Sequence, residues 1–252
     1  MRARSGGCGA RGVPAPWLRG GGRCGRDRGG AGRRRAARSG LNRSQTRRTV
    51  NKSIEFFDRQ FRQAPAEASL RLNPFEAQAL PHVHGEVLDF GSGMGNLTFA
   101  AAARGCRVTA LDGSAAAVAH MQRRAALEGL PVVATQADLS DYPIRQSYDT
   151  VVCIGLLMFF DGPTGWRVLG ELQRSTRPGG CLVLNVLVQG TTYMDMFDAE
   201  RHCLFTPEAL RQHFAGWRID SCELADFDAP GQTLKRFCTL IAHKPLNDPA
   251  PT

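Results

Sequence analysis

From residue 86 onward the sequence alternates short apolar runs, rich in β-branched residues, with longer stretches of helical periodicity. Predicted strands span residues 86–90, 107–111, 131–135, 148–154 and 181–188, with two more near 218–224 and 237–243. Predicted helices span residues 97–103, 114–127, 165–176 and 207–214. Strands that alternate with helices at such intervals form a parallel sheet with helices on both faces. The sequence therefore predicts an α/β fold with a mostly parallel sheet, in a single catalytic domain at residues 84–246.

Residues 1–49 have a different composition, dominated by Arg, Gly, Ala and Ser. Residues 1–50 hold 14 Arg and one acidic residue and so carry +13, whereas residues 51–252 carry −4. A segment with so little to bury cannot offset the entropy cost of ordering, so we expect disorder at 1–49 and at the C-terminus, 247–252. A nucleic-acid-binding tail, an organellar transit peptide and a stretch without a selected role all remain open for the Arg/Gly-rich segment. Residues 50–83 have apolar residues at helical spacing and predict a leading helical segment.

The eight cysteines are scattered and include no C-x-x-C pair. This spacing argues against a disulfide framework and against a zinc site, so we expect buried, reduced thiols and a cytoplasmic protein. His82 and His84 lie close together in the sequence but have no third ligand in view, and no metal is expected. The longest apolar stretch, Val151 to Phe160, is about half of the ~20 residues that cross a bilayer, so we expect no membrane contact.

A glycine-rich turn follows the first predicted strand, in the segment Val87-Leu88-Asp89-Phe90-Gly91-Ser92-Gly93-Met94-Gly95-Asn96. Ligands of open parallel sheets bind at the carboxyl ends of strands, and glycines let the backbone approach a ligand closely. A dinucleotide fingerprint needs its third glycine at the position of Asn96, so NAD is only the second choice of cofactor. A phosphate-binding P-loop is excluded, because no Gly-Lys-Ser/Thr follows at the required distance.

Acidic residues also follow the second and third predicted strands. Asp112 lies about 20 residues after the glycines, where a carboxylate can accept hydrogen bonds from ribose hydroxyls. Asp138 follows the third strand. Together with these acids, the D-x-G-x-G-x-G pattern resembles the motif of the class I S-adenosylmethionine-dependent methyltransferases, over roughly residues 84–244. The resemblance implies a Rossmann-like sheet and S-adenosylmethionine as the cofactor.

The resemblance also implies roles for individual residues. Asp89 would orient the glycine loop or meet the cofactor's amino group, Asp112 would bind the ribose, and Asp138 would contact the adenine amino group. The alternatives are a structural role for Asp89, a solvated loop acid or helix cap for the other two, and sheet core for Ile154. The expected cofactor-binding residues are Asp89, Gly91, Ser92, Gly93, Gly95, Asp112, Gly113, Asp138, Leu139 and Ile154.

Within this class, several segments are similar to the branch that contains the tellurite-resistance methyltransferase. They include Tyr148-Asp149, residues 156–160 and Arg177-Pro178-Gly179-Gly180. That branch methylates small, soft or thiol-like acceptors. The chain departs from it after Glu223-Leu224, where Ala225-Asp226 stands in place of a His-Arg pair, so the acceptor cannot be carried over.

The expected function is methyl transfer from S-adenosylmethionine to a small-molecule acceptor by in-line displacement. An RNA or protein methyltransferase and a non-catalytic cofactor-binding scaffold are the alternatives. Nucleic acid is the less expected partner, because the strand end Cys153-Ile154-Gly155-Leu156 lacks the Asn-Pro-Pro-Tyr-type sequence of amino-methylating nucleic-acid enzymes. No catalytic base stands out. Tyr193 and His202 are the best polar candidates near an acceptor, with a hydrogen-bonded Tyr and a surface His as alternatives.

Overall fold

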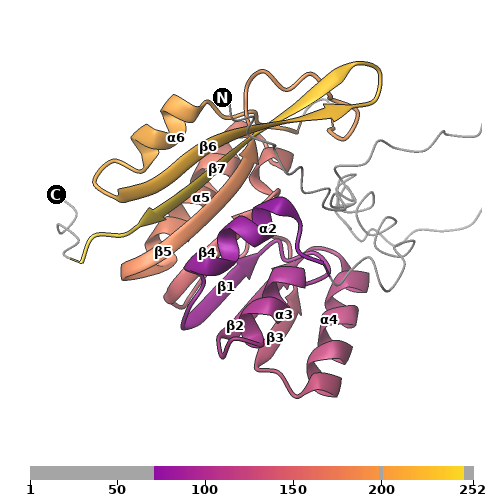
Figure 1. Ribbon diagram of the computed structural model, residues 1–252, viewed down its shortest axis with the longest axis vertical. Coiled ribbons are helices and arrows are strands. Elements are labelled where there is room, and N and C mark those ends of the chain that lie inside the picture. The colour runs from indigo at the N-terminus through magenta and orange to yellow at the C-terminus, as the bar shows by residue number, and fades with distance from the viewer. Residues whose placement is uncertain (1–70, 199–200, 247–252) are drawn as a thin grey trace, which may run out of the picture.

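A single seven-stranded sheet organises the computed structural model, which describes residues 71–198 and 201–246 (Figure 1). The strand order is β3-β2-β1-β4-β5-β7-β6. Neighbouring strands from β3 to β5 pair in parallel, and β7 pairs antiparallel with both β5 and β6. The strands are β1 Glu86–Phe90, β2 Arg107–Asp112, β3 Val132–Gln136, β4 Tyr148–Ile154, β5 Thr176–Leu187, β6 Arg218–Ala229 and β7 Thr233–His243. The predicted Rossmann-like, mostly parallel sheet is confirmed.

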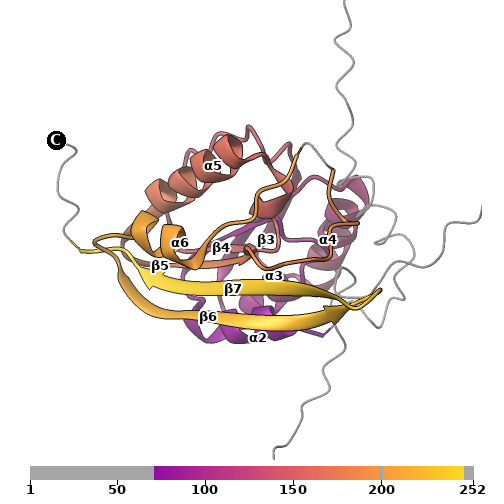
Figure 2. The ribbon, with the colours of Figure 1, turned by 90° about the horizontal axis from the view of Figure 1, so that it is seen from above.

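Helices cover both faces of the sheet. On one face, helices α2, α3 and α4 pack against the sheet through alternate residues of β1, β2 and β3. On the other face, α5 and α6 pack in the largest hydrophobic cluster, and Figure 2 shows α5 and α2 on opposite sides of the strands. The helices are α2 Pro74–Ala79, α3 Asn96–Ala102, α4 Ala115–Glu128, α5 Gly162–Ser175 and α6 Pro207–His213, with short 3-10 turns η3 Leu80–His82 and η4 Leu157–Phe159. Burial on both faces explains why the central strands read as continuous apolar runs.

Strand β5 corrects one prediction. The sequence predicts a turn at Arg177-Pro178-Gly179-Gly180, but these residues belong to β5, which begins at Thr176. Tyr148 pairs with Thr176 and Thr150 pairs with Cys181, so the ladder absorbs the extra residues in an irregularity. Gly179 has a φ of 76° there, a conformation that favours glycine. The backbone does turn at Gly179, but the residues on both sides of this turn belong to the same strand.

The hairpin of β6 and β7 is longer than predicted. Its strands run to Ala229 and from Thr233, whereas the apolar pattern supports only the parts nearest the core. The outer part has exposed polar residues, and there Arg236 donates to both oxygens of Asp226 at 2.8 and 2.7 Å. Backbone pairing continues to the end of the hairpin, and on its inner side Ala225, Phe227 and Ala229 pack against the cluster of Phe75 and Phe237.

Several predictions lie outside the described residues. They concern the tails at 1–49 and 247–252 and most of the leading segment 50–83. Of that segment the structure describes α2 and η3, in which Pro74 and Pro81 occupy first-turn positions where a missing N–H costs nothing. None of the helices in the described ranges is long and apolar enough to cross a membrane.

Candidate functional site

The glycine-rich turn joins the end of β1 to the start of α3. Gly91, Gly93 and Gly95 have φ angles of 88°, 53° and 79°, which side chains rarely adopt. A Cβ on Gly95 would lie 2.8 Å from Met121 Cγ in α4, so space as well as conformation demands glycine there. The turn is bound to the next strand, because the N–H groups of Gly91 and Ser92 both donate to the carbonyl of Leu111, at 2.8 and 3.0 Å.

Asp112, the last residue of β2, holds this turn directly. Its Oδ2 accepts a hydrogen bond from the N–H of Gly93 at 2.8 Å, and its Oδ1 accepts one from the N–H of Ser114 at 2.8 Å. Ser114 in turn caps α4 through a hydrogen bond from Ala117 N–H. The structure thus brings together the glycines and the acid that the sequence placed at two successive strand ends.

Asp89 lies beneath the turn and is almost fully buried. Its Oδ2 accepts a hydrogen bond from the hydroxyl of Thr98 in α3, at 2.6 Å. Burial raises the pKa of Asp89 to about 6, the hydrogen bond from Thr98 lowers it, and the charge of Asp112 raises it. The carboxyl group therefore orients the first turn of α3. Its ionised form is disfavoured, because burial removes it from water.

Glu76 of α2 is a site residue that the sequence analysis missed. Burial raises the pKa of Glu76 to about 7; a hydrogen bond from the backbone of Asn73 lowers it, and the charge of Asp89 raises it. Asn73 caps α2, and Glu76 Oε2 accepts from the Asn73 N–H at 2.7 Å, which completes a capping box. The pattern Asn-x-x-Glu was the available signal, but it indicates only a helix start.

These acids give the site a definite electrostatic preference. Glu76, Asp89 and Asp112 come from three different elements; the charge of Asp89 raises the pKa of Glu76, and the charge of Asp112 raises the pKa of Asp89. A positively charged ligand beside them would relieve this repulsion and favour the ionised carboxylates. The three acidic side chains therefore suit a positively charged ligand that also carries hydrogen-bonding groups.

The end of β3 lies beside the same edge. The N–H of Ala137 donates to the carbonyl of Asp112 at 3.0 Å, and Gln136 Nε2 donates to the carbonyl of Gly113 at 3.2 Å. Asp138 is exposed, and its Oδ1 accepts from both the N–H and the hydroxyl of Ser140. Leu139 is buried in the main hydrophobic cluster. Asp138 therefore lies at the carboxyl end of β3, as expected, and its carboxylate also holds the turn that leads to Ser140.

Strand β4 supplies an apolar border next to the turn. Leu156 lies so close to the turn that a Cβ on Gly91 would be 3.0 Å from Leu156 Cδ2. Ile154 is partly buried and packs against two hydrophobic clusters, one of them around Phe159. Gly155 has a φ of 70°, and its N–H donates to Asn185, which bends the chain away from the strand.

The two polar candidates for the acceptor side both have structural partners. Tyr193 is buried in a hydrophobic cluster, with Lys235 Nζ 4.4 Å from the centre of its ring. The imidazole of His202 stacks on Phe197 with ring centroids 5.1 Å apart, and its Nδ1 lies 3.3 Å from the carbonyl of Asp198. Tyr193 is thus buried rather than held by a hydrogen bond of its hydroxyl to another described residue, and His202 is partly buried rather than at the surface, so their roles near an acceptor stay predictions.

Residues 87–180 match the family model described as a methyltransferase domain. The matched segment contains the glycine turn, both strand-end acids and the border of β4. Over residues 87–180 the chain is therefore similar to methyltransferase domains, and its fold is that of a solved N-methyltransferase.

Known proteins resemble this chain to different extents. Hemagglutinin 1 of Eikenella corrodens is 31% identical over 170 residues, which are 64% of this chain and 55% of that protein. The chain thus spans about half the length of the curated relative that it matches. The crystal structure of TehB from Haemophilus influenzae has a TM-score of 0.61 at 17% identity, over 76% of this chain and 67% of that one.

A third similar protein carries ligands. The 1,6-didemethyltoxoflavin-N1-methyltransferase of Burkholderia thailandensis, solved with 1,6-didemethyltoxoflavin and S-adenosylhomocysteine, has a TM-score of 0.54 at 20% identity. The similarity covers 76% of this chain and 87% of that one. At such identities the two solved structures support the methyltransferase fold alone.

Proposed function

We propose that this protein transfers the methyl group of S-adenosylmethionine to a small-molecule acceptor. The observation that carries the proposal is the hydrogen bond from the N–H of Gly93 to the Asp112 carboxylate, which joins the ends of two neighbouring strands. Acids at the ends of two neighbouring parallel strands beside a glycine turn are typical of sites that bind a ribose and an extended nucleotide.

The residues present fit this cofactor on chemical grounds. Asp112 would accept hydrogen bonds from the ribose hydroxyls, and Asp138 would meet the adenine amino group. Asp89 and Glu76 carry raised pKa values, and a ligand with ammonium and sulfonium charges would favour their ionised forms. A side chain at Gly95 would clash with Met121. The backbone of the glycine turn therefore carries no side chain at this position, and a ligand can approach it closely.

The chain's contribution to the reaction is alignment in a dry site. The cofactor supplies an electrophilic methyl group on a positively charged sulfur. Asp112 and the glycine turn would hold the cofactor so that this methyl group faces the acceptor atom that would take it up. Holding the two reactants in line can contribute about 7–11 kcal/mol in favourable cases. Ile154 and Leu156 would exclude water from this place, which strengthens the electrostatic interactions.

The acceptor side favours a small and largely apolar substrate. The hydrophobic cluster next to Ile154 contains Phe159, Tyr193 and Met196, with Phe197 packed against it. Pockets for small ligands are lined mainly by such side chains with few polar groups. The toxoflavin enzyme, which has a similar fold, acts on a small aromatic molecule. Tyr193 and His202 remain the candidates for orienting a polar group of the acceptor.

A transfer experiment tests the acceptor class. The full chain is incubated with methyl-labelled S-adenosylmethionine and a cell extract separated into metabolite, protein and RNA fractions. We expect the label to appear in a molecule of the metabolite fraction. Label found only in protein or RNA would contradict a small acceptor, and cofactor binding without any transfer would identify a non-catalytic scaffold.

The raised pKa values predict how cofactor affinity depends on pH. A cationic cofactor prefers the ionised forms of Asp89 and Glu76, whose pKa values are about 6 and about 7, so affinity should rise as pH increases from about 5 to about 8. Each group contributes less than about a tenfold change per pH unit. Titration calorimetry across this range measures the effect.

Glu76→Gln should remove the upper part of this rise, near pH 7, and leave the lower part that belongs to Asp89. Glu208→Gln, at an exposed position in α6, is the matched control and should keep the whole profile. The raised pKa values also lower the stability of the cofactor-free protein, which should fall as pH rises from about 4 to about 7 and level off above. Affinity that falls with rising pH would contradict the assignment of these acids to the site.

A further inference from the structure

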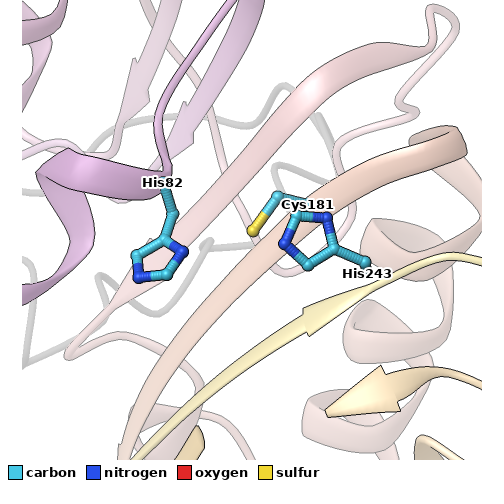
Figure 3. Close-up of side chains that lie close together, drawn as sticks. All are labelled: His82, Cys181 and His243. Carbon is cyan, nitrogen blue, oxygen red and sulfur yellow. The ribbon is translucent and has the colours of Figure 1, made fainter. Parts of the chain in front are cut away.

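Three potential metal ligands meet at the edge of the sheet opposite the glycine turn (Figure 3). They are the imidazoles of His82 and His243 and the thiol of Cys181, whose ligand atoms all lie within 4.8 Å of one another. Cys181 is fully buried, and the two histidines are partly exposed. The sequence analysis saw His82 without further ligands, because the other two become neighbours only when β5 and β7 pair.

The fold places two of these side chains rigidly. Cys181 and His243 are direct partners across the antiparallel pair of β5 and β7, so their side chains leave the same face of the sheet. Cys181 packs there with Val87 and Val183, in the cluster that also holds η3. His82, the last residue of η3, completes the group from the covering layer. Within the part of the chain that the structure describes, the His82 ring makes no hydrogen bond and is free to turn.

A carboxylate supports one of the histidines. Asp220 Oδ2 lies 3.1 Å from His243 Nε2, and Arg218 Nε lies 3.1 Å from the other oxygen of Asp220. Asp220 is the extra residue at an irregularity of β6, between Ile219 and Ser221, both of which pair with β7. A histidine ligand held by an outer carboxylate is a common arrangement in metal sites, because the carboxylate fixes the ring and raises its basicity.

We propose that His82, Cys181 and His243 bind one zinc ion. A thiolate and two imidazoles are the nitrogen and sulfur ligands that Zn²⁺ prefers, and three protein ligands leave a fourth tetrahedral position for water. Ligand atoms of a tetrahedral zinc site lie roughly 3.5 Å apart, so the present separations close with a movement of about 1 Å. The turn of the His82 ring can provide most of this movement.

Binding displaces the proton of the Cys181 thiol to solvent and forms a zinc–sulfur bond. Burial raises the pKa of Cys181 to about 12, with a further increase from the charge of Asp220 and a decrease from that of Arg218. A cation in contact with the sulfur offsets this cost, as it does in structural zinc sites. The ion would fasten η3 to β5 and β7, at a distance from the proposed cofactor site.

Metal titration of the full chain under reducing conditions tests the proposal. The protein is stripped with a chelator and titrated with zinc against a chromophoric competitor, and in parallel with Co²⁺. We expect one tight site per chain and a thiolate-to-cobalt absorption band. His82→Ala should weaken zinc binding by at least about tenfold, Asp220→Asn by about 10–100-fold, and Cys181→Ser should abolish the cobalt band.

His84→Ala is the matched control, since His84 is exposed and its Nδ1 lies near the carbonyl of His82 rather than in the cluster. This variant should bind zinc with unchanged affinity. Absence of a tight site would overturn the proposal. So would a site of equal affinity in His82→Ala and Cys181→Ser, because the metal would then be bound by other residues. Neither result would affect the proposed methyl transfer.

Discussion

Replacing Asp112 by alanine should lower the affinity for S-adenosylmethionine by at least about a hundredfold. The wild-type carboxylate holds Gly93 N–H and Ser114 N–H and is the proposed acceptor for the ribose hydroxyls. Hydrogen bonds to a charged group contribute about 1.5–3 kcal/mol each, so the loss of two amounts to a hundredfold or more. Calorimetric titration of the variant with the cofactor measures the change.

Asp141→Ala is the control for this substitution. Asp141 is an exposed acid in the loop after β3, and its removal changes the net charge by the same amount. We expect cofactor affinity within about twofold of wild type for it. Thermal unfolding should show that both variants are folded. If Asp112→Ala bound the cofactor as tightly as Asp141→Ala does, the ribose would lie elsewhere.

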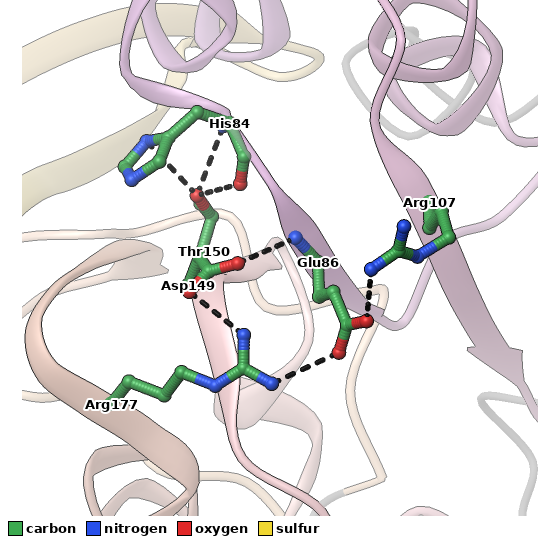
Figure 4. A network of polar contacts seen from close by, with 6 residues as sticks. All are labelled: His84, Glu86, Arg107, Asp149, Thr150 and Arg177. Carbon is green, nitrogen blue, oxygen red and sulfur yellow. Dashed lines mark hydrogen bonds and ion pairs between the residues drawn. The ribbon is translucent and has the colours of Figure 1, made fainter.

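Gly85→Ala should destabilise the protein by about 3 kcal/mol and lower its Tm by roughly 10 °C. Gly85 has a φ of 68°, and an added Cβ would clash with the Asp149 carboxylate and lie 2.9 Å from Asp149 Cβ. Figure 4 shows what this carboxylate holds: it accepts the N–H of Glu86 at 2.8 Å and pairs with Arg177 at 2.8 Å. The hydrogen bond from Glu86 N–H and the Arg177 guanidinium hold the pKa of Asp149 below its ordinary value.

Gly105→Ala separates the clash from the backbone strain. Gly105 has a φ of 90°, but a Cβ there meets nothing within 4 Å. Its substitution should therefore cost only the strain of a left-handed conformation, about 1–2 kcal/mol. Thermal and denaturant unfolding of both variants give the comparison. Equal losses would show that the clash with Asp149 costs nothing beyond the backbone strain.

The parallel part of the fold was predictable because its signals are local. The buried strands are continuous apolar runs, and caps such as Ser114 and Thr206 precede their helices by one residue. The glycine turn and Asp112 were found for the same reason, since each follows a recognisable strand and parallel strands end at one edge. The hydrogen bond from Gly93 N–H to the Asp112 carboxylate shows that the glycine turn and Asp112 lie side by side, as expected.

The remaining features depend on contacts between distant segments. Glu76 reads as a helix cap, and only the packing of α2 against α3 and β4 brings this partly buried acid near Asp89. His82 gains two potential ligands only through the pairing of β5 with β7. In the outer part of the β6 and β7 hairpin, Ala225, Phe227 and Ala229 alternate with polar residues, but the cluster that buries them includes Phe75 of α2, which is distant in the sequence. No local pattern contains this information.

The most direct test of the cofactor site is a titration of the full chain with S-adenosylmethionine, followed by a titration with NAD. It asks whether the glycine turn and Asp112 form that site. We expect one molecule of S-adenosylmethionine per chain and no binding of NAD. Failure to bind S-adenosylmethionine, or binding of NAD at the same site in its place, would contradict the assignment of the cofactor site.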